Sequence, residues 1–186
     1  MFHTELETER LRLRVLTEND ESFIYTLFSN EEVGRYLYDE EPFKEKKQAE
    51  EFIQWYSPQE ERPFNRFGIE LKTKGVLIGT CGYHEWDQVN HMAEIGYDLL
   101  PDYWGEGYMN EALQSLLAFG FTSMNLNRIH AYIALENSRS KNLLSKLNFS
   151  DEGIFRDKHL YKGTYYDHHC FSLLRKEWKK QRGSCI

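Results

Sequence analysis

The sequence predicts a mixed α/β fold (α+β), in which helices cover one central, mostly antiparallel sheet. Three observations predict this class. Strand-like and helix-like apolar patterns alternate along the chain, three strand patterns follow one another directly between residues 66 and 100, and no linker, repeat or low-complexity stretch interrupts them. With 186 residues, including 12 Tyr, 12 Phe and 4 Trp, the chain is large enough for one proper core. We therefore expect residues 1–186 to form a single domain.

The first predicted elements are a strand and two helices. Leu11–Val15 alternates apolar and basic residues, which predicts a strand with one buried face. Thr17 precedes an acidic helix start, and the apolar stripe of that helix ends at Phe28. A loop then leads to a second helix at about 44–56. Two prolines mark the expected end of that helix, Pro58 and Pro63.

The remaining patterns predict three antiparallel strands, a helix, a strand, a helix and a closing hairpin. In that order the ranges are 66–71, 76–86 and 91–100, then 111–121, 128–134 and 137–147, and finally 152–162 with 166–174. The turn at 72–75 is typical of a hairpin. The helix at 111–121 should carry the one crossover of the sheet.

Charge and its distribution limit the ligands of the protein. A net charge of −7 argues against nucleic acid as the main partner, because phosphate neutralisation needs a basic face. The same charge suits a cationic or neutral substrate. The basic run at 175–182 is predicted to be a solvated tail rather than a nucleic-acid contact.

Cysteine and histidine usage gives no metal or disulfide signature. The chain has an odd number of cysteines without metal-like spacing, which favours a reducing compartment; they are Cys81, Cys170 and Cys185. His168 and His169 are neighbours in a predicted strand, so their side chains point to opposite faces and cannot easily share one metal. No signal peptide and no apolar run of membrane-spanning length is found. We expect a soluble, cytoplasmic protein with no membrane partner and no metal.

The most informative segment is Asp102–Ala112, which joins a strand pattern to a helix pattern. Gly105 and Gly107 let backbone N–H groups turn toward a ligand without interference from a Cβ atom. The following helix adds unpaired N–H groups and the positive end of its dipole, so the turn is a candidate anion site. The segment contains no Lys or Arg, so backbone would hold most of a bound phosphate. It matches neither the dinucleotide fingerprint nor the P-loop, and a simple strand-to-helix connection is the alternative interpretation.

Three segments in order make the chain resemble the GNAT N-acetyltransferases, and within them the RimJ/RimL-like branch. They are Ala93–Tyr97, Trp104–Ala112 and Asn137–Phe149. The resemblance covers nearly the whole chain and implies a GNAT-like fold, with a six- to seven-stranded sheet, about four helices and acetyl-CoA as donor. It implies that the turn at 104–109 wraps the pyrophosphate and that the strand ending at Leu99 pairs its backbone with pantetheine. The residues expected to bind the cofactor are Tyr97, Leu99, Trp104, Gly105, Glu106, Gly107, Tyr108, Met109, Asn137, Ser140 and Lys146.

The chain departs from the general family pattern at three positions. Asp102 stands where many relatives carry Gln or Arg, which removes a possible side-chain donor to the pyrophosphate. Leu144 stands where many relatives place a tyrosine that protonates the leaving thiolate. Asn148 replaces a glycine, which is tolerable because Asn accepts left-handed backbone angles. The first two departures agree with the RimJ/RimL-like branch and leave the general acid open.

Amine acetylation needs a proton acceptor, because a free alkylamine is mostly protonated near pH 7. Glu94, on the strand expected beside pantetheine, is the first candidate for this base, with Asp98 on the same face. His84 and Glu85 on the preceding strand are the competitors. The alternative is that Glu94 is an ordinary solvated or ion-paired strand residue.

Asn137, Ser140 and Leu144 share one face of a predicted helix. If that face looks at the cofactor, Ser140 reaches the sulfur and assists the leaving thiolate, whereas Leu144 only packs. Plain N-capping is the alternative for both polar residues. Lys141 and Lys146 are candidates for phosphate contacts, or simply solvated.

These observations predict an acetyl-CoA-dependent N-acetyltransferase that works by direct transfer in a ternary complex. The resemblance favours a protein N-terminal α-amine as acceptor, for example that of a ribosomal protein. A small amine, such as a polyamine or an antibiotic, and a non-catalytic CoA-binding sensor are the alternatives. A covalent acetyl-cysteine route is disfavoured because no motif activates Cys81 or Cys170. The segment 29–63 carries no pattern that identifies the acceptor, and we expect a monomer or a homodimer.

Overall fold

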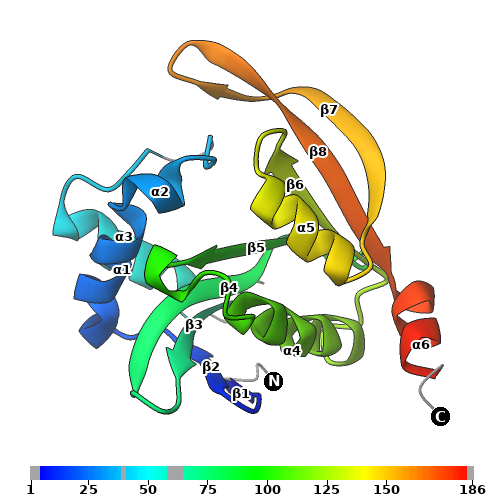
Figure 1. The fold of residues 1–186 in the computed structure, drawn as a ribbon, viewed down its shortest axis with the longest axis horizontal. Helices are drawn as coiled ribbons and strands as arrows, with labels where there is room; N and C mark the ends of the chain where they lie inside the picture. Colours follow the sequence, from blue (N-terminus) through cyan, green and yellow to red (C-terminus); the bar gives the residue numbers. More distant parts are fainter. Residues whose placement is uncertain (1–4, 39–40, 58–64, 184–186) are drawn as a thin grey trace.

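The computed structural model describes residues 5–38, 41–57 and 65–183, and eight strands of this part of the chain form one mixed sheet (Figure 1). The sheet order is β1-β2-β3-β4-β5-β6-β8-β7. All neighbouring strands are antiparallel except β5 and β6, which are parallel because a crossover helix connects them. The strands are β1 (Glu5–Glu7), β2 (Leu11–Val15), β3 (Asn65–Leu71), β4 (Val76–Asp87), β5 (Met92–Leu99), β6 (Arg128–Ala134), β7 (Ser150–Tyr161) and β8 (Thr164–Leu174).

Six α-helices accompany the sheet in the described ranges. They are α1 (Glu21–Phe28), α2 (Glu31–Gly34), α3 (Lys46–Tyr56), the crossover helix α4 (Tyr108–Thr122), α5 (Ser138–Lys146) and α6 (Arg175–Gly183). Local sequence explains several helix starts. Thr17 and Asp20 form a capping box at the 3₁₀ turn that leads into α1, and the side chain of Asn30 caps α2. At α5 the side-chain oxygen of Asn137 accepts the N–H of Ser140 at 3.1 Å.

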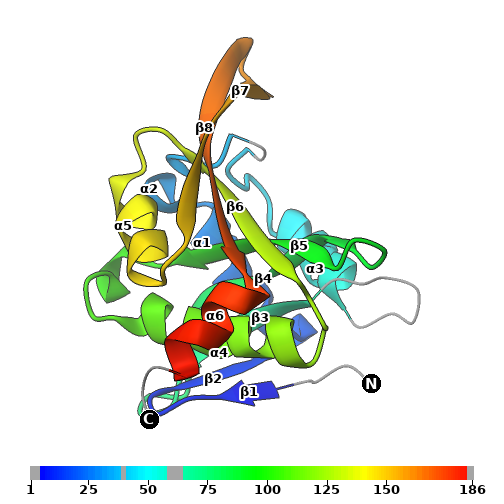
Figure 2. The ribbon, with the colours of Figure 1, turned by 90° about the vertical axis from the view of Figure 1, so that its right-hand side faces the viewer.

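Strand alternation directs side chains into two hydrophobic clusters. The larger cluster lies between the sheet and α4, where Ile69, Leu113 and Leu116 are fully buried. The smaller cluster joins α1 to α3 and includes Leu16, with Leu77 packed against it. The long β7–β8 hairpin projects away from this body in both views (Figures 1 and 2).

The parallel pair β5–β6 opens into a splay, and this opening positions the site. Residues 92–94 of β5 lie opposite residues 128–130 of β6, ending with Glu94 opposite His130. Both strands then continue, β5 to Leu99 and β6 to Ala134, but in the described structure the ladder between them stops (Figure 1). The inner edge of β5 is therefore available to pair with a ligand, as an edge strand is.

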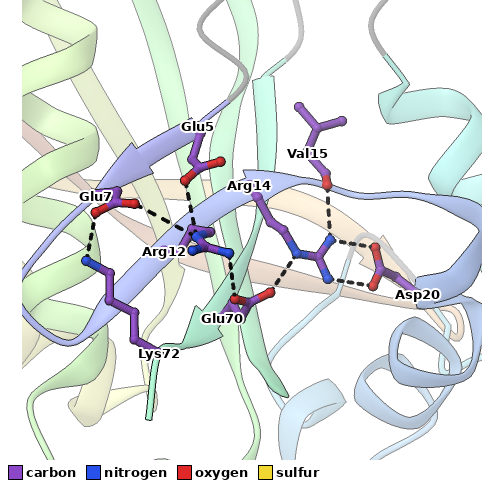
Figure 3. A network of polar contacts seen from close by, with 8 residues as sticks. All are labelled: Glu5, Glu7, Arg12, Arg14, Val15, Asp20, Glu70 and Lys72. Carbon is purple, nitrogen blue, oxygen red and sulfur yellow. Dashed lines mark hydrogen bonds and ion pairs between the residues drawn. The ribbon is translucent and has the colours of Figure 1, made fainter. Parts of the chain in front are cut away.

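A network of charged side chains ties the first three strands to the start of α1 (Figure 3). Both terminal nitrogens of Arg14 donate to the carboxylate of Asp20 at 2.8 Å, and Arg14 Nε donates to Glu70 at 2.9 Å. Burial by itself would raise the pKa of Asp20, but hydrogen bonds from Arg14 and Thr17 outweigh it and lower that pKa. Asp20 therefore stays ionised although it is buried.

The predicted order of elements is confirmed, and three details are corrected. The described residues give eight strands rather than six or seven, because the three-residue β1 is too short for alternation to reveal it. They give six α-helices rather than about four, because α2 has only four residues and α6 was assigned to a tail. Helix α4 begins at Tyr108, three residues before the predicted start. Pro58, Pro63 and Cys185 lie outside the described residues.

The prediction of a solvated C-terminal tail at 175–182 is wrong. These residues lie in α6, whose Trp178 packs against Phe121 with ring centroids 5.2 Å apart. Arg175 anchors its start by donating from Nε to the carbonyl oxygen of Leu126 at 2.6 Å. Trp178 is the one large apolar residue of α6, so the segment has no apolar stripe that sequence inspection could detect.

Candidate active site

A cleft of about 790 Å³ lies where β5 and β6 separate. Residues of β5, β6, the turn before α4 and the helix α5 line it. All but one of the predicted site residues are among them: Glu94, Tyr97, Leu99, Trp104, Gly105, Gly107, Tyr108, Met109, Asn137, Ser140 and Lys146. The exception is Glu106, whose backbone carbonyl instead accepts a hydrogen bond from Arg10 at 3.0 Å.

The Gly-x-Gly turn has the backbone shape that the sequence predicts. Gly105 and Gly107 have φ angles of 83° and 80°, in the left-handed region that favours glycine, and Gly107 is the N-cap of α4. A Cβ atom on Gly105 would meet nothing within 4 Å, so open space lies beside the turn. The indole N–H of Trp104 donates to the carbonyl of Leu99 at 2.8 Å and fixes the turn to the end of β5. The free N–H groups of the first turn of α4 add to this anion site.

The structure adds positive charge that the turn segment itself lacks, because two arginines from distant segments reach the turn. The Arg139 guanidinium lies 3.9 Å from the ring centre of Trp104, and Arg139 lines the cleft together with Lys146. Arg10 reaches the back of the turn, where it pairs with Glu111 at 2.6 Å. The sequence segment itself holds no cation, so only the fold reveals this positive charge.

Across the splay, Tyr97 of β5 meets Ser140 of α5. Their oxygen atoms lie 2.6 Å apart, and Ser140 is 7% exposed. Burial raises the pKa of Tyr97 despite the opposing effect of this hydrogen bond, so the phenol stays protonated at neutral pH. Asn137 has a capping role, whereas Leu144 is fully buried in the larger cluster. A pair of hydrogen-bonded hydroxyl groups therefore lines the cleft one helical turn before Leu144.

At the closed end of the splay, Glu94 lies opposite His84 on β4 and opposite His130 on β6. Glu85 belongs to an irregularity in the β4–β5 register and has a φ of 49°, and bulges of this kind redirect a side chain. A carboxylate oxygen of Glu85, one of Glu94 and a ring nitrogen of His130 consequently lie within 4.8 Å of one another. The predicted second carboxylate, Asp98, is instead buried in an ion pair with Arg66.

His130 was not among the predicted site residues. It is 7% exposed, and in the described part of the chain its Nδ1 is buried with no hydrogen-bond partner. Burial and the nearby Arg128 lower the pKa of His130, so it is neutral near pH 7. The sequence shows a histidine in a strand, but only the parallel register brings it opposite Glu94.

The two described cysteines are poor nucleophiles. Burial raises the pKa of Cys81 to about 12, and burial also raises the pKa of Cys170. Both thiols are therefore protonated at neutral pH, which agrees with direct rather than covalent transfer. Separately, the described helices include none whose length and apolar character would let it cross a membrane.

Comparison with known proteins agrees with this geometry. Residues 10–150 match the family model described as the acetyltransferase (GNAT) domain. The uncharacterized N-acetyltransferase p20 of Bacillus licheniformis is 43% identical over 174 residues, covering 93% of this chain and 97% of the relative. A mostly antiparallel sheet that splays at its parallel pair, with a glycine turn before the crossover helix, thus defines an acyl-transferring fold. The chain belongs to the GNAT family and is an N-acetyltransferase.

Other relatives carry more specific names. YdaF of Bacillus subtilis, a proposed ribosomal N-acetyltransferase, is 34% identical over 62% of this chain and 64% of its own. Spermidine N(1)-acetyltransferase of Vibrio cholerae is 28% identical over 85% of this chain and 89% of its own. A crystal structure of spermidine N-acetyltransferase from Vibrio cholerae, in complex with CoA and spermine, superposes with a TM-score of 0.81 at 26% identity, covering 92% of this chain and 99% of that one. The GNAT fold uses acetyl-CoA as its acetyl donor.

Proposed function

We propose that the chain works as a single catalytic domain that moves an acetyl group from acetyl-CoA in the β5–β6 splay directly to a primary amine. The observation that carries this proposal is the polarity of the cleft. Its turn end has open N–H groups with Arg139 and Lys146, and its other end has the carboxylates of Glu85 and Glu94. An anionic donor and a cationic acceptor can therefore enter at opposite ends.

The residues present fit acetyl-CoA. The open space at Gly105 gives backbone N–H groups access to phosphate, and Arg139 and Lys146 add positive charge beside it. The exposed edge of β5 beyond Glu94 suits backbone pairing with an extended amide chain. When bound, acetyl-CoA supplies an acetyl group activated as a thioester.

Glu94 is the proposed base, and Ser140 the proposed source of help for the departing thiolate. Glu94 lies at the apex of the splay and lines the cleft, so it can take the proton that keeps the amine unreactive. Ser140 holds a hydroxyl proton in the cleft and is backed by the protonated phenol of Tyr97. Because a thiolate is a fair leaving group, its assistance should be the smaller effect.

We propose a protein N-terminal α-amine as the acceptor, in line with the RimJ/RimL-like branch. An α-amine has a pKa near 7.7–8.0, whereas an alkylamine such as lysine has about 10.4, so its deprotonation is easier. The β7–β8 hairpin borders the cleft through Lys158 and His159 and exposes Ile154, Phe155, Leu160 and Tyr165. These apolar side chains offer a surface to a polypeptide.

A polyamine is the second candidate, and the acidic end of the cleft favours it. Glu85 and Glu94 suit a cationic chain without side chains, and the spermidine acetyltransferases among the relatives support this reading. Competition decides between the two. The enzyme with acetyl-CoA should be given N-terminal peptides, spermidine and an aminoglycoside at equal concentration, and the products measured by mass spectrometry. A preference for spermidine by 10-fold or more in kcat/KM would overturn the peptide proposal, and transfer to none of them would refute both acceptors.

A further inference from the structure

Three acceptor atoms surround one small space at the apex of the splay. One carboxylate oxygen of Glu85, one of Glu94 and one ring nitrogen of His130 lie within 4.8 Å of one another. For three points no farther apart than this, some point lies at most about 4.8/√3, or roughly 2.8 Å, from all of them, which is hydrogen-bond distance for a nitrogen atom. A primary ammonium has three N–H donors, so one ammonium nitrogen matches the three acceptors.

His130 gives this cluster a feature that surface carboxylates lack. The residue is almost completely buried, with only 7% of its surface exposed. In the described residues no group satisfies its Nδ1, and a buried polar atom without a partner is costly. An imidazole with one ring nitrogen unsatisfied can take up a proton during the reaction without breaking an existing hydrogen bond at that nitrogen.

Charged groups of both signs surround His130, and together with its burial they keep the imidazole neutral and ready to accept a proton. Glu85 on β4, Glu94 on β5 and Glu152 on β7 provide negative charge. Arg128 on its own strand and Lys158 on β7 oppose them. Glu152 is paired with Arg128 at 2.6 Å, whereas a carboxylate oxygen of Glu85 and one of Glu94 lie within 4.8 Å of a ring nitrogen of His130.

We propose that Glu85, Glu94 and His130 form a binding site for the ammonium group of the acceptor, with His130 as the second proton acceptor behind Glu94. This rests on the proposed role of Glu94. One N–H bond of the ammonium breaks, its electron pair stays on nitrogen, and the carboxylate of Glu94 takes the proton. Once the acetylated product leaves, water in its place carries that proton from Glu94 to a ring nitrogen of His130, and Glu94 returns to its ionised form. The cluster thus gains one positive charge. Because Glu85 is exposed, it gives the extra proton a route to solvent.

Binding can be tested without knowing the acceptor, by using propylammonium chloride as probe. In ¹H–¹⁵N spectra of the histidine rings, propylammonium should shift the His130 signals saturably in the wild type and not in Glu85→Gln. The probe should leave His169, which pairs with Asp151 on another part of the sheet, unchanged. If His130 responds to micromolar Zn²⁺ but not to propylammonium, the cluster is a metal site and the proposal is overturned.

Kinetics test the proton transfer, with an N-terminal peptide or spermidine as acceptor, whichever the enzyme turns over. His130→Asn should lower kcat by roughly 10-fold at pH 7 while the KM for acetyl-CoA changes less than about twofold. The deficit should shrink toward pH 9, where more free amine is present. The matched control His169→Gln should keep wild-type kcat.

The two levels of the proposal fail differently. A slow Glu94→Gln enzyme (roughly 10²-fold lower kcat) beside a fully active His130→Asn enzyme would refute the His130 inference and leave Glu94 as base. Wild-type turnover of Glu94→Gln at pH 7 would refute the base itself. Should His130→Asn fail to fold, His130→Gln and the probe titration of the wild-type protein still decide the matter.

Discussion

The phenol oxygen of Tyr97 lies 2.6 Å from the hydroxyl oxygen of Ser140, and this contact bridges the two sides of the splay. Tyr97 comes from β5 and Ser140 from α5, so the hydrogen bond joins the strand proposed to pair with the donor to the helix beside it. Burial keeps the phenol protonated, which leaves Ser140 with a proton-bearing neighbour. The pair therefore has a hydroxyl proton to offer, which Leu144 lacks.

We expect Ser140→Ala to lower kcat by roughly 10-fold, less than the loss expected for the base, because thiolate departure needs only modest help. Ser140→Thr should recover part of the activity. Tyr97→Phe should lower kcat less than Ser140→Ala, since Ser140 keeps its own hydroxyl. Steady-state kinetics with acetyl-CoA as the varied substrate measure these effects.

The control for this helix is Ser145→Ala. Its hydroxyl donates to the carbonyl of Lys141 at 2.9 Å on the exposed side of α5, so kcat should not change. If Ser140→Ala raises only the KM for acetyl-CoA, Ser140 is a cofactor contact rather than a proton source. Full activity in a stable Ser140→Ala enzyme would leave the hydroxyl with no role.

Replacing Gly105 by alanine should weaken CoA binding by about 10-fold or more, because the new methyl group enters the open space beside the turn. The left-handed backbone at φ 83° also makes this substitution strained. Gly163→Ala separates the two effects, because Gly163 has φ 80° and open surroundings at the tip of the β7–β8 hairpin. Calorimetry should show similar losses of stability and unequal losses of CoA affinity; equal affinities would place the site elsewhere.

The sequence could predict the site where it depends on local pattern, and could not where it depends on register. Gly105 and Gly107 predict a left-handed turn because few other residues tolerate that backbone. Glu94 was identifiable from its place on a strand. His130 was not, because its meeting with Glu94 depends on how a parallel pair aligns across the crossover connection at residues 100–127.

The difference between local pattern and three-dimensional contact also explains why the sequence did not predict the arginine at the turn, the bulge at Glu85 or helix α6. Arg139 reaches Trp104 through the packing of α5 against the turn, a contact between segments about 35 residues apart. The bulge that redirects Glu85 depends on a backbone angle that no residue pattern there requires. Trp178 is the one apolar side chain of α6 that packs against the body, so the sequence of this helix resembles a charged tail.

Arg139→Gln should weaken CoA binding by roughly 10-fold at low salt, because a guanidinium beside the turn can make charge-assisted hydrogen bonds to phosphate. The loss should shrink as salt rises and screens the interaction. Lys141→Gln removes the same charge from the same helix at a position that does not line the cleft, so it should cost at most about twofold. Equal effects of the two variants would show that only the general field of α5 matters. Titration at two ionic strengths distinguishes these outcomes.

Asp20→Asn should destabilise the fold by about 2 kcal/mol, because the partly buried guanidinium of Arg14 loses its bidentate partner and keeps only Glu70. Glu32→Gln, which removes one partner of the exposed pair with Arg35, should cost less than about 1 kcal/mol.

The effect at Asp20 should depend on pH. Its folded pKa is lowered, so its stabilisation is complete above the unfolded value near 3.9 and is lost as the pH falls through the lower folded value. Denaturant unfolding of the wild type and of Asp20→Asn should therefore show a constant difference in the free energy of unfolding above about pH 5, and this difference should disappear in acid. A difference that is unchanged down to pH 2 would mean that the carboxylate charge of Asp20 contributes nothing.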